Sequence, residues 1–158
     1  MHKIRDGLRE LIIEGDLLSE SSSKEPGKER WISFKLFKTY SGVYVVSRVG
    51  YSMLFHAEDC EVVNRNHLSP ELAENMAEGE YTPCRKCDPV WFDPNGIFPE
   101  KPRYHSQVCQ SARGVVEYLQ QEDKKGVAYM TNVSRKLLEN ASEIDDGIRK
   151  AYMTEVIS

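Results

Sequence analysis

The sequence predicts an α+β protein, in which a small antiparallel sheet with a structural zinc site stands between an N-terminal helix and a C-terminal helical subdomain. Three observations lead to this prediction. Residues 30–55 are rich in β-branched and aromatic side chains, both ends of the chain show helical periodicity, and cysteines at ligand spacing follow the β-rich run. A chain of 158 residues has one core with extensions rather than two large domains.

Composition and charge are those of an ordinary globular protein. Hydrophobic residues make up 40%, charged residues 29%, and the net charge is -4 without a basic block. Indiscriminate binding of nucleic acid by bulk charge is therefore not expected. No apolar run approaches the roughly 18 to 20 residues that cross a bilayer, and the N-terminus is charged throughout. We expect a cytoplasmic protein without a membrane partner.

The N-terminal helix is predicted for residues 1–20 and ends in a linker at residues 21–29. The linker is polar and contains Pro26 and Gly27, which interrupt regular structure. The helix is predicted from apolar residues that recur at helical spacing. They are Ile4, Leu8, Leu11, Ile12 and Ile13.

The sheet module is predicted for residues 30–89. Its first half is punctuated at Ser41-Gly42 and at Gly50, which is typical of two or three antiparallel strands joined by tight turns. Ser69-Pro70-Glu71 then supplies an N-cap, a first-turn proline and a first-turn acid. A short helix should follow and should end at Gly79.

The C-terminal third is predicted to be a proline-rich connection followed by helices. Residues 90–105 contain three prolines without any periodicity, which indicates a long irregular segment. Residues 106–158 carry three apolar stripes at helical spacing. Three such helices can pack on each other, on the sheet module or on a partner, and the sequence leaves these alternatives open.

Four cysteines, Cys60, Cys84, Cys87 and Cys109, require a chemical interpretation. Structural disulfides are not favoured in a chain without an export signal. A redox pair is not favoured either, because a dithiol oxidoreductase begins a helix with its C-x2-C, whereas Cys87 runs into Asp88-Pro89. Cys109 is interpreted as a buried free cysteine on an amphipathic helix and as a reserve ligand.

The remaining cysteines predict a metal site. His56 and Cys60 form an H-x3-C pair, and after 23 intervening residues Cys84 and Cys87 form a C-x2-C pair. One imidazole and three thiolates make a closed, four-coordinate zinc site of the structural type. Its ligands are His56, Cys60, Cys84 and Cys87. Arg85 and Lys86 lie where they can offset its negative charge.

The stretch "GYSMLFHAEDCEVV" and the later "GEYTPCRKCDP" resemble the zinc-binding N-terminal domain of the Ada DNA-repair and response protein. That family has an aromatic-rich strand, C/H-x3-C, a short helix and then aromatic-x-P-C-x-x-C-x-P. Tyr81, Pro83 and Pro89 match the second half, and the match covers about residues 40–89. The resemblance implies a zinc fold and suggests DNA as the partner.

One departure from that family bears on activity. In Ada, the first zinc cysteine accepts a methyl group from a DNA phosphotriester, and His56 takes its place here. An imidazole offers no thiolate, so methyl transfer is not expected. Four protein ligands also leave no open position for a zinc hydrolase. The chain contains no phosphate-binding glycine loop or serine elbow. We therefore expect a protein that is not an enzyme.

The leading hypothesis is a non-enzymatic, zinc-stabilised binding module that binds DNA or regulates through it. Basic residues alternate with aromatics around the predicted hairpin, although half-buried strands use the same residues for packing. The candidate contacts are Lys28, Arg30, Lys35, Lys38, Arg48, Arg85 and Lys86. The alternative is protein-protein interaction, in which the C-terminal helices dock on a host factor, as in a phage or mobile-element regulator, or form a homodimer. A nuclease accessory is a lesser alternative.

Overall fold

The computed structural model describes residues 1–57, 68, 82–84 and 97–154, and in this part of the chain it confirms an α+β fold with antiparallel pairing and three helices. The chain divides into two units. Unit 1 comprises Met1–Ser23, Ile32–Val49 and Tyr104–Ser158, and unit 2 comprises Lys24–Trp31 and Gly50–Arg103. Three of the four boundaries fall inside strands, so three strands begin in one unit and end in the other.

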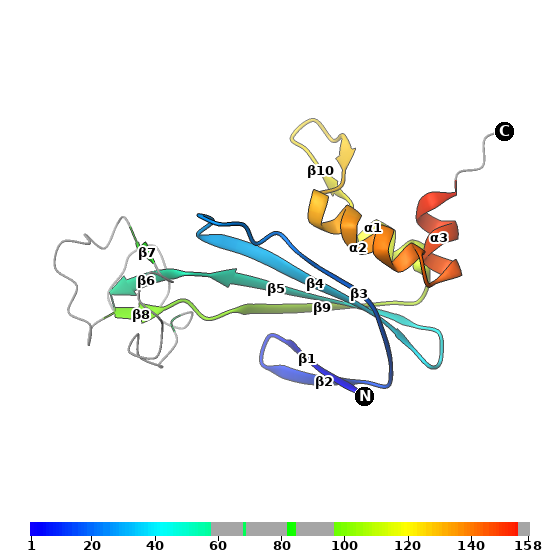
Figure 1. Ribbon diagram of the computed structural model, residues 1–158, viewed down its shortest axis with the longest axis horizontal. Helices are drawn as coiled ribbons and strands as arrows, with labels where there is room; N and C mark the ends of the chain where they lie inside the picture. The colour runs from blue at the N-terminus through cyan, green and yellow to red at the C-terminus, as the bar shows by residue number, and fades with distance from the viewer. Residues whose placement is uncertain (58–67, 69–81, 85–96, 155–158) are drawn as a thin grey trace. The chain divides into compact units, whose positions relative to one another are not determined.

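The central element of unit 1 is a four-stranded sheet (Figure 1). Its strands are β3 (Gly15–Ser22), β4 (Arg30–Thr39), β5 (Tyr44–Ser52) and β9 (Arg103–Cys109), in the order β3-β4-β5-β9. The predicted hairpin is confirmed, because β4 and β5 are joined by a turn in which Gly42 has a φ of 93° that favours glycine. The turn expected at Gly50 does not form, because Gly50 lies within β5.

The predicted N-terminal helix is wrong, because residues 2–22 form strands. β1 (His2–Asp6) and β2 (Arg9–Ile13) make an antiparallel hairpin, and β3 follows directly. Gly7, with a φ of 60°, closes the hairpin. A helix would have buried Leu8 with its apolar neighbours, whereas in the hairpin Leu8 lies fully exposed in the turn. The predicted linker is corrected too, since its first two residues, Ser21 and Ser22, belong to β3.

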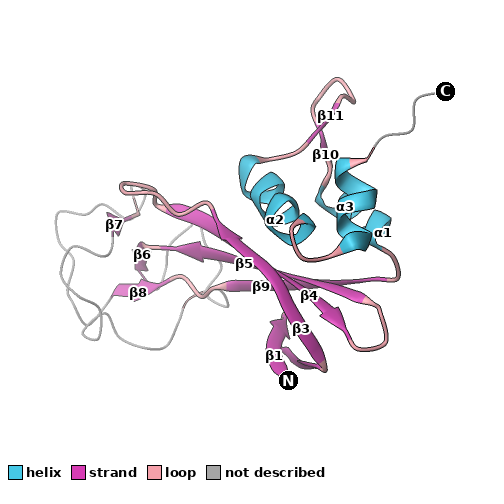
Figure 2. Ribbon diagram, turned by 45° about the vertical axis from the view of Figure 1, so that its right-hand side comes forward, coloured by secondary structure: helices cyan, strands magenta, loops and turns pink. Residues whose placement is uncertain are grey.

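Both faces of the sheet in unit 1 are covered, as Figures 1 and 2 show. The helices α1 (Ala112–Leu119), α2 (Asn132–Ser142) and α3 (Asp146–Met153) cover one face, and the β1-β2 hairpin covers the other. Phe34 and Leu36 of β4 join the helices in one buried cluster, whereas Phe37 joins the hairpin in a second. The predicted apolar stripes therefore pack on each other and on this sheet.

The C-terminal helices begin later than residue 106 because strands take up part of the segment. Residues 103–109 form β9, and β10 (Gln121–Glu122) pairs with β11 (Ala128–Tyr129) between α1 and α2. The predicted connection at 90–105 likewise contains β8 and the start of β9. Ser111, Thr131 and Asp145 cap the three helices. Among the described residues, no helix is long and apolar enough to cross a membrane.

Unit 2 is built around a three-stranded sheet. Its strands are β6 (Leu54–Ala57), β7 (Thr82–Pro83) and β8 (Ile97–Pro99), in the order β7-β6-β8. β6 pairs with β7 in parallel and with β8 in the antiparallel sense. The helix predicted between Ser69 and Gly79 lies outside the described residues.

Candidate metal centre

Two of the four predicted zinc ligands lie at the ends of neighbouring strands in unit 2. In the parallel pair, Leu54 is opposite Thr82 and Phe55 is opposite Pro83. The next residues along the two strands are His56 and Cys84, and the Cys84 N–H donates to the Phe55 carbonyl at 2.9 Å. Paired residues of parallel strands share one face of a sheet. The fold therefore brings together one residue from each half of the predicted motif.

A carboxylate that no sequence motif indicated lies directly beside His56. β8 places Pro99 opposite Phe55, and the following residue, Glu100, donates its N–H to the Leu54 carbonyl. Glu100 Oε1 lies 2.7 Å from Nε2 of His56. His56 is fully buried and Glu100 is 5% exposed. An imidazole held by a buried carboxylate is the usual arrangement around a metal-binding histidine.

Arg30 holds Glu100 from the other side. One guanidinium nitrogen donates to Oε1 at 2.6 Å and the other donates to Oε2 at 2.7 Å, so the pair is bidentate. Burial alone raises the pKa of Glu100, but the hydrogen bonds from Arg30 and His56 outweigh it and lower the pKa below its ordinary value. At neutral pH Glu100 is therefore an ionised hydrogen-bond acceptor.

The donor set at this position suits zinc. Cys84 is buried and free of any disulfide, and thiolate and imidazole are the ligands that structural zinc prefers. The other two predicted ligands, Cys60 and Cys87, lie outside the described residues, as do Arg85 and Lys86. Within the part that is described, no three ligand-type side chains cluster. If zinc binds, His56 and Cys84 supply two of its four ligands and Glu100 stands behind the imidazole.

Cys109 has a different environment from Cys84. It ends β9 rather than lying on a helix, and it belongs to the apolar cluster between the sheet and the helices of unit 1. Burial raises the pKa of its thiol, which disfavours the thiolate that metal binding requires. The prediction of a buried free cysteine is confirmed, and its surroundings do not favour the reserve-ligand role.

Five of the basic residues predicted to contact nucleic acid are described, and they divide between the two units. Arg30 is bound to Glu100 in unit 2, and Lys38 donates to Asp145 at 2.8 Å in unit 1. Lys35 is exposed, and because side chains alternate along β4 it points away from the helix-covered face that Lys38 shares with Leu36. Arg48 is half-buried on β5, and Lys28 lies 4.0 Å from Glu25.

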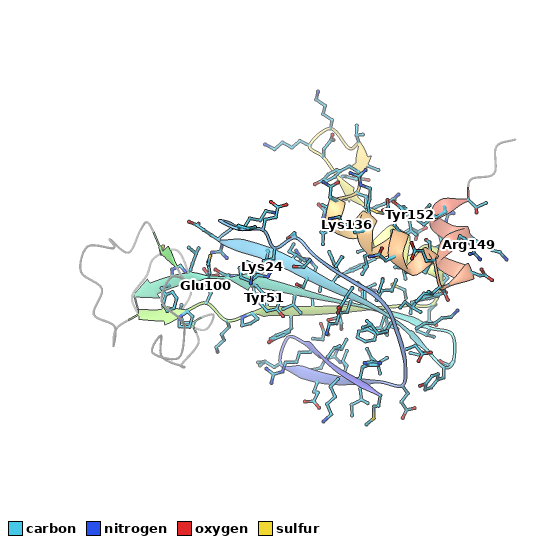
Figure 3. The ribbon with its side chains drawn as sticks, in the orientation of Figure 1. Lys24, Tyr51, Glu100, Lys136, Arg149 and Tyr152 are labelled. Atoms are coloured by element: carbon cyan, nitrogen blue, oxygen red, sulfur yellow. The ribbon has the colours of Figure 1, made fainter. Side chains whose placement is uncertain are left out.

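The described part of unit 2 contains a row of stacked side chains, which consists of Lys24, Trp31 and Tyr51. The Trp31 and Tyr51 rings stack with their centroids 5.7 Å apart, and the Lys24 ammonium lies 4.9 Å from the Trp31 centroid. Figure 3 marks Lys24 and Tyr51 of this row. Aromatic rings flanked by cations are the elements from which proteins build stacking surfaces for bases, and they also stabilise strands by cross-strand packing.

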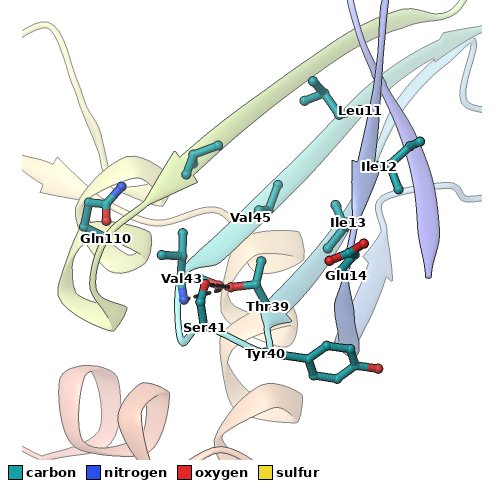
Figure 4. A pocket seen from close by; sticks show the side chains of 11 residues that line it. Leu11, Ile12, Ile13, Glu14, Thr39, Tyr40, Ser41, Val43, Val45 and Gln110 are labelled. Carbon is teal, nitrogen blue, oxygen red and sulfur yellow. Dashed lines mark hydrogen bonds between the residues drawn. The ribbon is translucent and has the colours of Figure 1, made fainter.

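Unit 1 contains a pocket of about 860 Å³ beside the β1-β2 hairpin (Figure 4). Apolar side chains, including Leu11, Ile13 and Val45, make up most of its wall, and among the described lining residues Glu14 alone is charged. Ile12 and Val108, which also line it, are at least half exposed. The described lining residues include no cluster of titratable groups, so the chemistry of the pocket fits an apolar ligand or side chain better than catalysis.

The chain was compared with protein-family models, with curated proteins and with solved structures, and none of the three comparisons gave a match. The resemblance to the Ada zinc domain therefore rests on the motif residues alone.

Glu100 was missed because it belongs to a proline-rich stretch that the sequence predicts to be irregular. One signal was available, since Glu100 is the only acid between Asp93 and Glu117.

Proposed function

We propose that the chain is a non-enzymatic binding module whose unit 2 is stabilised by zinc and whose partner is DNA. The observation behind this proposal is the buried pair of His56 and Glu100 on the strand beside Cys84, which directly follows β7 and donates its N–H to Phe55 of β6. Structural zinc sites stabilise small sheets because binding energy adds directly to folding energy. Strands β7 and β8 are only two and three residues long, and strands this short pair weakly without further support.

The DNA part of the proposal comes from the resemblance to the Ada domain and from the side chains of unit 2. Lys24, Trp31 and Tyr51 combine charge for phosphates with flat rings for exposed bases. Protein binding through the C-terminal helices has less support, because those helices bury their apolar stripes in unit 1. The pocket in unit 1 keeps a protein partner as the second candidate.

Metal analysis followed by fluorescence anisotropy tests this proposal. The purified protein should carry one zinc per chain, and labelled duplex and single-stranded DNA should bind with an affinity that falls as salt rises, because cation release drives phosphate contacts. Replacing Trp31 with alanine should weaken binding about 10-fold, since one stacked base contributes about 1–3 kcal/mol. Lys136→Ala, on helix α2 of unit 1, is the matched control and should leave binding unchanged.

Two results would count against the proposal in different ways. A protein that takes up no zinc, when refolded with the metal, excludes the metal site. A zinc-loaded protein that binds neither form of DNA at low salt excludes the DNA partner but leaves the zinc module standing. The search would then move to ligands of the pocket in unit 1.

A further inference from the structure

We propose that Glu100, fixed by Arg30, is a positioning residue that selects the metal-binding nitrogen of His56. In this arrangement the carboxylate holds the hydrogen on Nε2, so that the imidazole binds zinc through Nδ1. The inference rests on the proposed zinc site and assigns a role to two residues outside the predicted ligand set.

The hydrogen-bond geometry dictates which ring nitrogen carries the hydrogen. Both oxygens of Glu100 accept from the Arg30 guanidinium, at 2.6 and 2.7 Å, and an arginine side chain offers donors only. A carboxylate bound in this way is itself only an acceptor, so the group that faces Oε1 at 2.7 Å must be an N–H. That group is Nε2 of His56. A neutral imidazole has a single N–H, and its metal-binding lone pair is then on Nδ1.

Burial makes this choice energetically firm. His56 and Glu100 both lie in the interior, at 0% and 5% exposure. If the hydrogen moved to Nδ1, the Nε2 lone pair would face the carboxylate oxygen, and two buried acceptors would repel each other. The carboxylate also fixes the plane of the imidazole ring, which favours metal binding.

Arg30 is the part of this chain of contacts that reaches solvent. Its side chain is about half exposed, at 49%, whereas the Glu100 side chain is 2% exposed. Arg30 donates from the segment Lys24–Trp31, while His56 and Glu100 come from residues 50–103. The ion pair therefore ties the two separate stretches of unit 2 to the metal ligand.

Glu100→Gln tests the inference because glutamine keeps the size of glutamate and removes the charge. We expect the zinc affinity of this variant, measured by competition with a chromophoric chelator, to fall by about 10- to 100-fold. Long-range ¹⁵N–¹H NMR of His56 should show the Nε2–H form in the zinc-loaded wild type and a mixture of forms in apo Glu100→Gln. Arg30→Lys, which keeps the positive charge and replaces the bidentate guanidinium with a single ammonium, should show a smaller loss.

Asp145→Asn is the matched control, because Asp145 is a buried carboxylate in unit 1 that pairs with Lys38. It should lower the melting temperature without changing zinc affinity or the His56 signals. If Glu100→Gln and Arg30→Lys both bind zinc as tightly as the wild type and keep its Nε2–H form, the positioning role is wrong although the zinc site stands. A wild type that takes up no zinc instead refutes the proposed function. If Glu100→Gln does not fold, the zinc affinity of Arg30→Lys decides, and an affinity equal to that of the wild type overturns the positioning role.

Discussion

Asp145 shows how much a single carboxylate contributes to unit 1. It accepts hydrogen bonds from the Lys38 ammonium at 2.8 Å, from the Tyr44 hydroxyl at 2.7 Å and from the Ile148 N–H at 3.0 Å. The last of these caps helix α3. Burial alone raises the pKa of Asp145, but the hydrogen bonds from Lys38 and Tyr44 outweigh it and lower that pKa below its ordinary value.

The lowered pKa predicts how the stability of unit 1 depends on pH. A carboxyl group whose pKa is lower in the folded state adds stability above its unfolded pKa of about 4, and this stability is lost as pH falls through the folded pKa. Urea unfolding, followed at unit 1 amides between pH 7 and pH 2, should show this loss. Asp145→Asn should be about 1–2 kcal/mol less stable at pH 7 and should show a flatter pH dependence. If Asp145→Asn and the wild type lost stability equally as pH falls, Asp145 would not be the source of the pH dependence.

At the scale of elements, helix α3 approaches strand β5 closely through a glycine. A Cβ atom at Gly147 would lie 2.4 Å from the Tyr44 hydroxyl oxygen, and Tyr44 is itself 4% exposed and held by Asp145. The ring cannot move aside without breaking that hydrogen bond. The absence of a side chain at Gly147 therefore allows the cap of α3 and strand β5 to share Asp145.

Gly147→Ala should destabilise unit 1 by about 1–3 kcal/mol, although alanine is the better helix former. Gly114→Ala in helix α1 is the matched control, because a Cβ there meets its nearest atoms at 3.5 Å, an ordinary contact. That change should be neutral or stabilising by up to about 1 kcal/mol. Thermal unfolding of both variants distinguishes them, and equal shifts in the same direction would show that packing against Tyr44 does not decide the outcome.

The elements that the sequence predicted are those whose pattern is local. β4 and β5 were predicted from their β-branched residues and the turn at Gly42, and α2 and α3 from their apolar stripes. The β1-β2 hairpin was not, since Ile4, Leu11 and Ile13 fit a helix as well as strands. What distinguishes the hairpin from a helix is the two-residue turn at Gly7, whose positive φ a helix does not contain.

The candidate site was predictable only where it has a motif. His56 and Cys84 carry ligand spacing, so the sequence could single them out. Glu100 could not be assigned in the same way, because its role depends on β8 pairing with β6 across more than forty residues. Arg30 was identified as a cation but for another role, because a sequence does not show which carboxylate an arginine will meet.

At the scale of the whole molecule, the proposed zinc site predicts that the two units respond differently to loss of the metal. Cys84→Ser, or chelation of the metal, should remove amide protection from β6, β7 and β8, because zinc binding supplies much of the folding energy of a small module. Unit 1 has its own buried core, so its amides should stay protected in hydrogen exchange. Cys109→Ala is the control, since it should weaken unit 1 and keep the zinc. Simultaneous loss of protection in both units would refute this independence.

The longer stretch of unit 2, Gly50–Arg103, separates most of β5 from β9 in the sequence, and this also sets an order of events during synthesis. The sheet of unit 1 needs β9 beside β5, and its buried cluster needs Ile148 of α3. A ribosome therefore releases the whole of unit 2, which ends at Arg103, before unit 1 can complete its core. Until then, Val46 and Leu36 lack the helices that cover them, and exposed strands of this kind favour aggregation. We therefore expect the nascent chain to depend most on chaperones after β5 has been made and before α3 has been made.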